Sequence, residues 1–276
     1  MDAAAAADAA ASPLVVEADL ERRFGGVRRL YGEAGYQRLR HAHVAVVGLG
    51  GVGSWAVEAL ARSGVAALTL IDLDHVSESN INRQLQALEG TLGMAKALAL
   101  RERIAQIHPM CEVHAIEAFV EAGNWPGLLQ GRPVDGVIDA CDQVRAKQAI
   151  AEWSFASHVP VVCAGAAGGK RAAQHVEVAD LAVVTHDPLL AALRQRLRKA
   201  GAARSGAIGV RCVFSREAVR RPDAAACDSD AAPPDGSLNC HGYGSSVAVT
   251  ASFGMVAAGE LMLCIVAAEK HADARC

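Results

Sequence analysis

A glycine-rich segment near residue 50 has the composition of a phosphate-binding loop. Gly48, Gly50 and Gly53 are spaced as G-x-G-x-x-G, and Gly51 lies in the same run. The apolar, β-branched residues 43–48 come before it, and apolar residues at helical spacing follow it. Between a strand and a helix, such glycines let the backbone approach a phosphate while the N–H groups of the first helical turn face the anion. The segment therefore predicts a nucleotide-binding site.

Acidic, amide and cationic residues beyond the next predicted strand indicate how the nucleotide is used. Asp72, at the end of the predicted strand 67–72, could hold a ribose hydroxyl, as in an NAD-dependent oxidoreductase. The polar residues beyond it are Asp74, Asn80, Arg83, Gln84 and Lys96. Hydride transfer does not require them, whereas nucleotidyl transfer needs cations that offset the charge of departing pyrophosphate. They favour an enzyme that binds ATP and uses Arg83 and Lys96 as catalytic residues, and the oxidoreductase stays an alternative.

Two carboxylates end a later predicted strand, at residues 134–139. Asp139 and Asp142 occur in the sequence I-D-A-C-D. Because the carboxyl ends of parallel strands share one edge of a sheet, we expect both near the glycine loop. A carboxylate at that edge can bind Mg²⁺ together with phosphate oxygens, and either Asp139 or Asp142 could supply it. The simpler alternatives are a helix N-cap for Asp142, a solvated helix residue for Lys96 and a surface ion pair for Arg83.

Short apolar runs alternate with segments of helical periodicity between residues 43 and 164. The predicted strands are 43–48, 67–72, 112–117, 134–139 and 159–164, and the predicted helices are 54–63, 92–107 and 144–157. Such alternation predicts an α/β fold, a doubly wound, mostly parallel, Rossmann-like sheet with helices on both faces. Beyond Gly169 the alternation is less regular. We therefore expect a C-terminal extension there, with a basic helix at residues 189–199.

The chain of 276 residues is expected to form one domain over residues 20–269. The Ala-rich residues 1–19 are predicted to be a disordered tail, and the Pro- and Asp-rich residues 220–237 a mobile loop. Residues 247–268 approach the length of a membrane span, but their Ala- and Gly-rich composition and Glu260 favour a buried core helix. No membrane partner is therefore expected.

The charge and the cysteines restrict the partners and the compartment. A formal net charge of −3 gives no basic signature, so any nucleic acid must bind a local patch. The chain has eight cysteines but no C-x-x-C pair, which argues against a structural zinc site. Scattered cysteines in a chain of this length are expected to be reduced thiols. We therefore predict a cytoplasmic protein without zinc.

The ordered motifs resemble those of a known family. G-L-G-G-V-G-S, L-I-D-L-D, S-N-I-N-R-Q, G-M-A-K and I-D-A-C-D look like the motifs of the ubiquitin-activating-enzyme-like (ThiF/MoeB/HesA) adenylyltransferases, over about residues 20–265. The resemblance implies that Asp72 binds the ATP ribose and that Asp142 carries the magnesium and the catalytic role. The residues that it places around the phosphates are Asn80, Arg83, Gln84 and Lys96.

The resemblance also has implications for assembly and ligands. It implies a homodimer, in which an arginine near the N-terminus completes the ATP site of the partner subunit. The candidates for that arginine are Arg22, Arg23, Arg28 and Arg29. A monovalent cation is a further candidate ligand, and proteins related to cysteine desulfurases are candidate partners.

Five further segments resemble one branch of that family, the tRNA threonylcarbamoyladenosine dehydratases. They are residues 22–32, 164–169, 187–198, 210–217 and 239–246. This likeness implies an enzyme that uses ATP to dehydrate N6-threonylcarbamoyladenosine at position 37 of tRNA, cyclising it through an adenylated carboxylate and releasing AMP and pyrophosphate. One alternative is an adenylyltransferase that activates the C-terminal carboxylate of a sulfur-carrier or ubiquitin-like protein. Another is an RNA-binding protein that keeps the fold without catalysis.

A tRNA substrate requires a local basic surface. Between residues 189 and 221, nine basic residues accompany a single acid, Glu217. The residues assigned to tRNA phosphates are Arg194, Arg196, Arg198 and Lys199, with a solvated helix face as the alternative. Cys240 matches the late cysteine of the family and is a further catalytic candidate, because the neighbouring His241 would favour a thiolate. Internal cyclisation does not require this thiol, so a structural role stays open.

Overall fold

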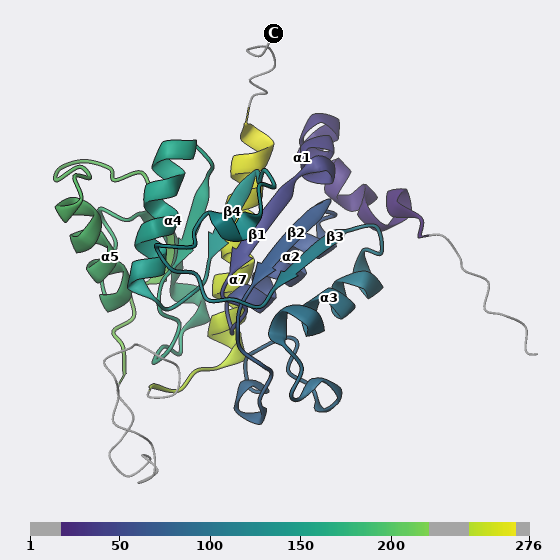
Figure 1. Ribbon diagram of the computed structural model, residues 1–276, viewed down its shortest axis with the longest axis horizontal. Coiled ribbons are helices and arrows are strands. Elements are labelled where there is room, and N and C mark those ends of the chain that lie inside the picture. Colours follow the sequence, from purple (N-terminus) through teal and green to yellow (C-terminus); the bar gives the residue numbers. More distant parts are fainter. Residues whose placement is uncertain (1–17, 221–242, 269–276) are drawn as a thin grey trace, which may run out of the picture.

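A seven-stranded sheet forms the centre of the computed structural model, which describes residues 18–220 and 243–268. Its strand order is β3-β2-β1-β4-β5-β7-β6 (Figure 1). The strands are β1 (His43–Val47), β2 (Ala67–Ile71), β3 (Glu112–Ile116), β4 (Gly136–Asp139), β5 (Val161–Ala164), β6 (Val176–Asp180) and β7 (Arg211–Ser215). Neighbouring strands pair in parallel, except that β6 is antiparallel to β7. The strand order reverses between β1 and β4, and α/β sheets bind ligands at such a switch point.

Helices cover both faces of the sheet (Figure 1). They are α1 (Leu20–His41), α2 (Gly53–Arg62), α3 (Lys96–Ile107), α4 (Val144–Ser157), α5 (Pro188–Lys199) and α7 (Val247–Ala267). In β1, Val44 and Val46 pack with α1, α2, α3 and α7, whereas Ala45 and Val47 pack with α4 on the opposite face. The α5 helix packs beside α4. Burial on both faces explains why the residues of β1 after His43 are all apolar.

The predicted fold class and strands are confirmed. Each of the five predicted strands lies within two residues of its expected bounds, and the helix predicted at residues 144–157 coincides with α4. The helix predicted from residue 92 begins instead at Lys96. The reason is local, since Gly93 has a φ of 81° and the backbone of Gly93 and Met94 bonds to Val76. The helix α1 and the strands β6 and β7 were not predicted.

The predicted tail at residues 1–19 is too long at its C-terminal end. Asp19 is the N-cap of α1, and its side chain accepts a hydrogen bond from the backbone N–H of Arg22 at 3.0 Å. Residues 1–17 lie outside the described part of the chain, as does all of the predicted loop 220–237 except Arg220.

Among the residues that the structure describes, α7 alone is long and apolar enough to cross a membrane, with a mean hydropathy of 1.9. Such length and composition are weak evidence of a membrane span, because core helices share them. Here α7 packs against α1, α2 and the strands β4 to β7, and half of its apolar stretch is buried. Val249, Phe253 and Leu261 are fully buried. The expected core helix at this position is confirmed.

Candidate functional site

The glycine loop connects β1 to α2 at the switch point of the sheet, and its close packing explains two of its glycines. Gly48 has a φ of +83°, and a Cβ at this position would lie 2.7 Å from the backbone nitrogen of Cys141. A Cβ on Gly53 would overlap the carbonyl oxygen of Gly48. The loop is thus folded tightly on itself and against the chain that follows β4, which brings the N-terminus of α2 to the carboxyl edge of the sheet.

We expect the substitution Gly53→Ala to unfold the glycine loop. Its methyl group has no space beside the Gly48 carbonyl, so the free energy of unfolding should fall by about 3 kcal/mol, at the upper end for overpacking. Thermal unfolding and ATP binding would be measured together. The matched control is Gly90→Ala, because a Cβ there meets no atom within 4 Å. Equal stability and ATP binding in the two variants would contradict this account of the loop.

A cavity of about 920 Å³ opens at the carboxyl edge of the sheet, in front of the glycine loop. The predicted ATP-site residues that line it are Gly48, Gly50, Gly51, Asp72, Asp74, Asn80, Arg83, Gln84, Lys96 and Asp142. Gly53 does not line it and instead begins α2 behind the loop. Residues from four separate segments of the sequence therefore meet in one cavity, with both carboxylates and cations on its walls.

The carboxylate of Asp72 ties the glycine loop to the end of β2. Its Oδ2 accepts a hydrogen bond from the N–H of Leu49 at 2.6 Å, and its Oδ1 accepts one from the N–H of Asp74 at 2.8 Å. Burial raises the pKa of Asp72, although Lys96 and the two N–H donors oppose this. Asp72 thus orders the loop and also lines the cavity, and its assignment to the ATP ribose stays a prediction.

The two predicted catalytic cations are buried and held by oxygen atoms. The ammonium group of Lys96 lies 2.7 Å from Oδ2 of Asp74, and Lys96 is only 5% exposed, so it is not a solvated helix residue. The guanidinium group of Arg83 donates to the carbonyl of Ser79 at 2.6 Å and to Oδ1 of Asn82 at 2.9 Å. Arg83 is 8% exposed, which argues against a surface ion pair. Both charges are pre-oriented at the cavity wall, where a polyphosphate would benefit from them.

The two carboxylates after β4 have different environments. Asp139 is 1% exposed, and its Oδ1 accepts from Nζ of Lys147 at 3.1 Å and from Sγ of Cys141 at 3.0 Å. The Oδ1 atom of Asp139 is therefore already hydrogen-bonded inside the protein. Asp142 is exposed and lines the cavity. Burial raises the pKa of Cys141 well above its usual value, so that residue faces the cavity as a thiol.

Other segments of the cavity wall were not assigned from the sequence. They are residues 118–123 after β3, Gln143, Arg145 and Ala146 at the start of α4, residues 165–168 after β5, and His75, Leu189 and Thr250. Most of them follow the carboxyl ends of strands, so the rule that located Asp72 and Asp142 could have found them. Most of them are small or apolar, and the ionisable ones, His75, Glu121 and Arg145, belong to no motif that the sequence analysis recognised.

The basic residues of α5 differ in how much of their charge faces solvent. The guanidinium group of Arg194 is hydrogen-bonded within the fold, because it donates to the carbonyls of Leu181 at 3.1 Å and Val184 at 2.7 Å. Arg196 and Lys199 are exposed, whereas Nε of Arg198 is buried without a partner among the described residues. The assignment of these residues to tRNA stays a prediction.

The wider basic segment is less cationic than its sequence indicates. Arg211 pairs with Glu260, and Nε of Arg216 lies 2.9 Å from Oε1 of Glu177. These acids come from other elements of the chain, so counting charges along one segment overestimated the basic surface. Cys240, the remaining catalytic candidate, lies outside the described residues.

The four N-terminal arginines all lie on α1. The guanidinium group of Arg23 donates to the carbonyl of Ile107 at 2.7 Å, and Arg28 pairs with Glu21 and Glu33 of its own helix. Arg22 and Arg29 are exposed.

The sheet order, the glycine loop at the switch point and the charged cavity define a nucleotide-binding α/β protein whose site suits nucleotidyl transfer. The chain belongs to the ThiF family, whose sequence profile matches residues 25–275. This confirms the family that the motifs resembled.

Relatives of known function cover nearly the whole chain. It is 44% identical to the tRNA threonylcarbamoyladenosine dehydratase of Escherichia coli (strain K12), over 88% of this chain and 93% of the relative. It is 39% identical to the protein of the same name from Haemophilus influenzae, over 88% of this chain and 92% of that relative. The crystal structure of the E. coli enzyme in complex with ATP matches with a TM-score of 0.80 and 41% identity, covering 92% of this chain and 98% of that one.

Proposed function

We propose that this chain is an ATP-dependent tRNA threonylcarbamoyladenosine dehydratase, which converts N6-threonylcarbamoyladenosine in tRNA to its cyclic form. The observation that carries the proposal is the 44% identity to the E. coli dehydratase across 93% of that enzyme. The cavity supports it, because it combines a glycine loop with buried cations and an open carboxylate, as carboxylate adenylation requires.

The first proposed step is transfer of AMP to the substrate. An oxygen of the threonyl carboxylate forms a bond to the α-phosphorus of ATP, and the bond from that phosphorus to the bridging oxygen breaks, so pyrophosphate leaves. Arg83 and Lys96 offset the negative charge that grows on the departing phosphates. Their hydrogen bonds to Ser79, Asn82 and Asp74 hold them in place before ATP binds.

The second proposed step closes the ring without a protein nucleophile. The carbamoyl group of the same nucleoside attacks the acyl carbon of the mixed anhydride, loses a proton, and displaces AMP. The oxygen removed from the substrate leaves with AMP, so the nucleoside loses the elements of water. These bonds account for every atom of the reaction, so no thioester at Cys240 is required.

The donor set of the cavity suits a magnesium ion bound to ATP. Asp142 offers an open carboxylate, while the neighbouring Asp139 is already satisfied by Lys147 and Cys141. Mg²⁺ in such sites is held by one or two carboxylates together with phosphate oxygens, and it neutralises phosphate charge. A homodimer, a monovalent cation, partners related to cysteine desulfurases and a cytoplasmic location complete the proposal.

The test is mass spectrometry of the nucleosides of tRNA that carries threonylcarbamoyladenosine. After incubation with the protein, ATP and magnesium, the nucleoside should lose the mass of one water, and omission of ATP should prevent the loss. An unchanged nucleoside, with folded protein that binds ATP, would instead favour a protein C-terminal carboxylate as the substrate. Pyrophosphate exchange that depends on an added sulfur-carrier protein would then be measured.

A further inference from the structure

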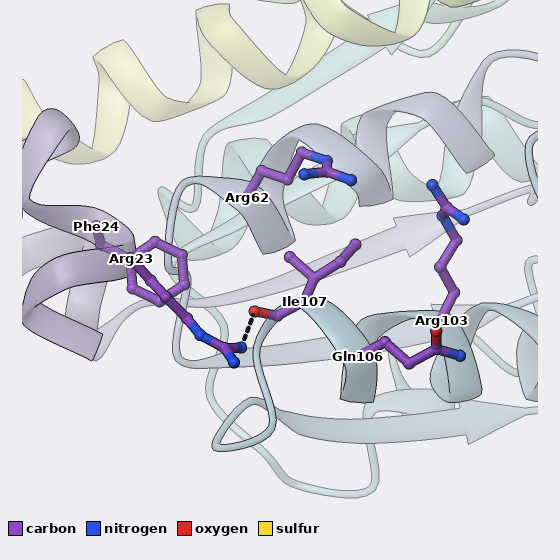
Figure 2. Close-up of a pocket in the computed structure, with 6 residues that line it drawn as sticks. All are labelled: Arg23, Phe24, Arg62, Arg103, Gln106 and Ile107. Atoms are coloured by element: carbon purple, nitrogen blue, oxygen red, sulfur yellow. Dashed lines mark hydrogen bonds between the residues drawn. The ribbon is translucent and has the colours of Figure 1, made fainter. Parts of the chain in front are cut away.

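A second cavity, of about 440 Å³, lies at the end of α2 that is remote from the glycine loop. The residues that line it are Arg23, Phe24, Arg62, Arg103, Gln106 and Ile107. Figure 2 shows three guanidinium groups around it, one each from α1, α2 and α3. None of the six lining residues is acidic. The cavity is thus a concave surface whose ionisable groups are all cationic.

Glu58 is hydrogen-bonded to two of the three guanidinium groups. Arg103 donates to both carboxylate oxygens of Glu58, at 2.7 and 2.9 Å, and Nε of Arg62 donates at 2.7 Å. Burial of Glu58 opposes its ionisation, but the hydrogen bonds from Arg103 and Arg62 outweigh this and lower its pKa. The carboxylate therefore stays ionised and orients both arginines before any ligand arrives.

Among the described residues, the cavity keeps a positive charge when the carboxylate bonded to its arginines and the adjacent helix ends are counted. One carboxylate against three guanidinium groups leaves an excess of two positive charges. The C-terminal ends of α2 and α3 lie here, and each contributes about −0.5 charge from the helix dipole. About one positive charge remains. Capping of the helix ends thus accounts for Arg23, which donates to the Ile107 carbonyl, but not for all three arginines.

The chemistry of the cavity selects a phosphate group. Guanidinium N–H groups match phosphate oxygens in pairs, and each arginine has donors beyond those bonded to Glu58 or Ile107. Phe24 is only 2% exposed, and its ring faces Arg40 and His108, so it offers no surface for base stacking. Recognition here would therefore be of a backbone phosphate rather than of a base.

The distance from the nucleotide site indicates a large ligand. The ten residues of α2 separate Gly53 beside the glycine loop from Arg62 at the cavity, which corresponds to ~15 Å of helix. The two cavities share no lining residue and lie at opposite ends of α2, so ATP bound in front of the loop does not occupy the second one, whereas a tRNA is large enough to contact both. We propose that this cavity binds a backbone phosphate of the tRNA substrate, an inference that rests on the proposed function.

The experiment measures tRNA binding at several salt concentrations for Arg62→Gln and Arg103→Gln. Loss of one phosphate contact should weaken tRNA binding. A plot of the logarithm of the association constant against the logarithm of the salt concentration should become less steep by about 1. In turnover, KM for tRNA should rise while kcat and KM for ATP stay constant, because the contact is remote from the reacting atoms. Arg62→Lys keeps the charge and should keep the slope. Thermal unfolding verifies that each variant is folded.

The matched control is Arg101→Gln, an exposed arginine of α3 that does not line the cavity. Slopes for the cavity variants that equal those of this control would overturn the inference.

Calorimetric titration with inorganic phosphate tests whether the cavity binds free phosphate instead of a tRNA phosphate. If phosphate binds the wild type but not Arg62→Gln while the tRNA slopes are unchanged, a free phosphate is the occupant and tRNA is not. A wild type that binds tRNA but never dehydrates its nucleoside would defeat the proposed function, and the slopes would still decide this inference.

Discussion

The substitution Asp142→Asn is expected to lower the rate of AMP formation by about 100- to 1,000-fold, as loss of one transition-state electrostatic contact typically does. The side chains have nearly the same shape, so the variant removes charge without changing packing. Because Asp142 is exposed at the cavity wall, the free energy of unfolding should change by less than about 0.5 kcal/mol. Release of AMP in the presence of tRNA and ATP is the measurement.

A magnesium titration makes this prediction specific to the assigned role. The variant should require a higher magnesium concentration for its residual activity, because one anionic ligand of the ion is absent. The control is Glu152→Gln, an exposed carboxylate of α4 outside the cavity, which should leave activity and the magnesium requirement unchanged. Full turnover of Asp142→Asn would remove this residue from the mechanism.

The substitution Lys147→Met is expected to destabilise the fold by about 3–5 kcal/mol, the usual cost of leaving one member of a buried ion pair unpaired. Lys147 is 0% exposed and donates to Oδ1 of Asp139 at 3.1 Å and to the carbonyl of Ala164 at 2.9 Å. Burial opposes its charge, but Asp139 outweighs this and raises the pKa of Lys147, so Lys147 is charged at neutral pH. Tm should fall by roughly 6–20 °C in thermal unfolding.

The double variant Lys147→Met, Asp139→Asn separates the lost charge from lost packing. Removing the second charge should recover much of the stability, since the uncompensated carboxylate causes most of the cost. Activity should recover with it, because the amide oxygen of asparagine can still accept from the N–H of Cys141, as Asp139 does at 3.2 Å, and so keep the segment that carries Asp142 in place. A single variant as stable as the wild type would show that the pair contributes little.

The predictable part of the fold consists of elements whose burial leaves a simple pattern. The strand β1 is apolar from Val44 to Val47 because both faces are covered, and α4 has helical spacing along its full length. In contrast, β6 is half-buried in all of its residues and pairs antiparallel at the edge of the sheet. The α1 helix contains Gly25 and Gly26 and is interrupted at Gly32, where φ is 70°, so its periodicity is weak.

The residues of the site also divide into those that the sequence pattern locates and those that it does not. Residues at strand ends, such as Asp72 and Asp142, could be located from the sequence because parallel strands end at a common edge. The partners of charged residues could not. Lys147 has the sequence context of a surface helix residue, yet it is fully buried against Asp139, and Arg211 finds Glu260 from an element far along the chain. Such pairs depend on tertiary packing, which single-sequence patterns do not encode.

The placement of α7 has a consequence for biosynthesis. This helix, yellow in Figure 1, is the last described element of the chain, yet its residues fill the core beneath α1, α2 and four strands. While a ribosome is still translating, the earlier elements therefore expose the apolar surface that α7 will later cover, and they cannot complete their core. The nascent chain therefore exposes an aggregation-prone apolar surface until α7 has been translated and has packed against these elements.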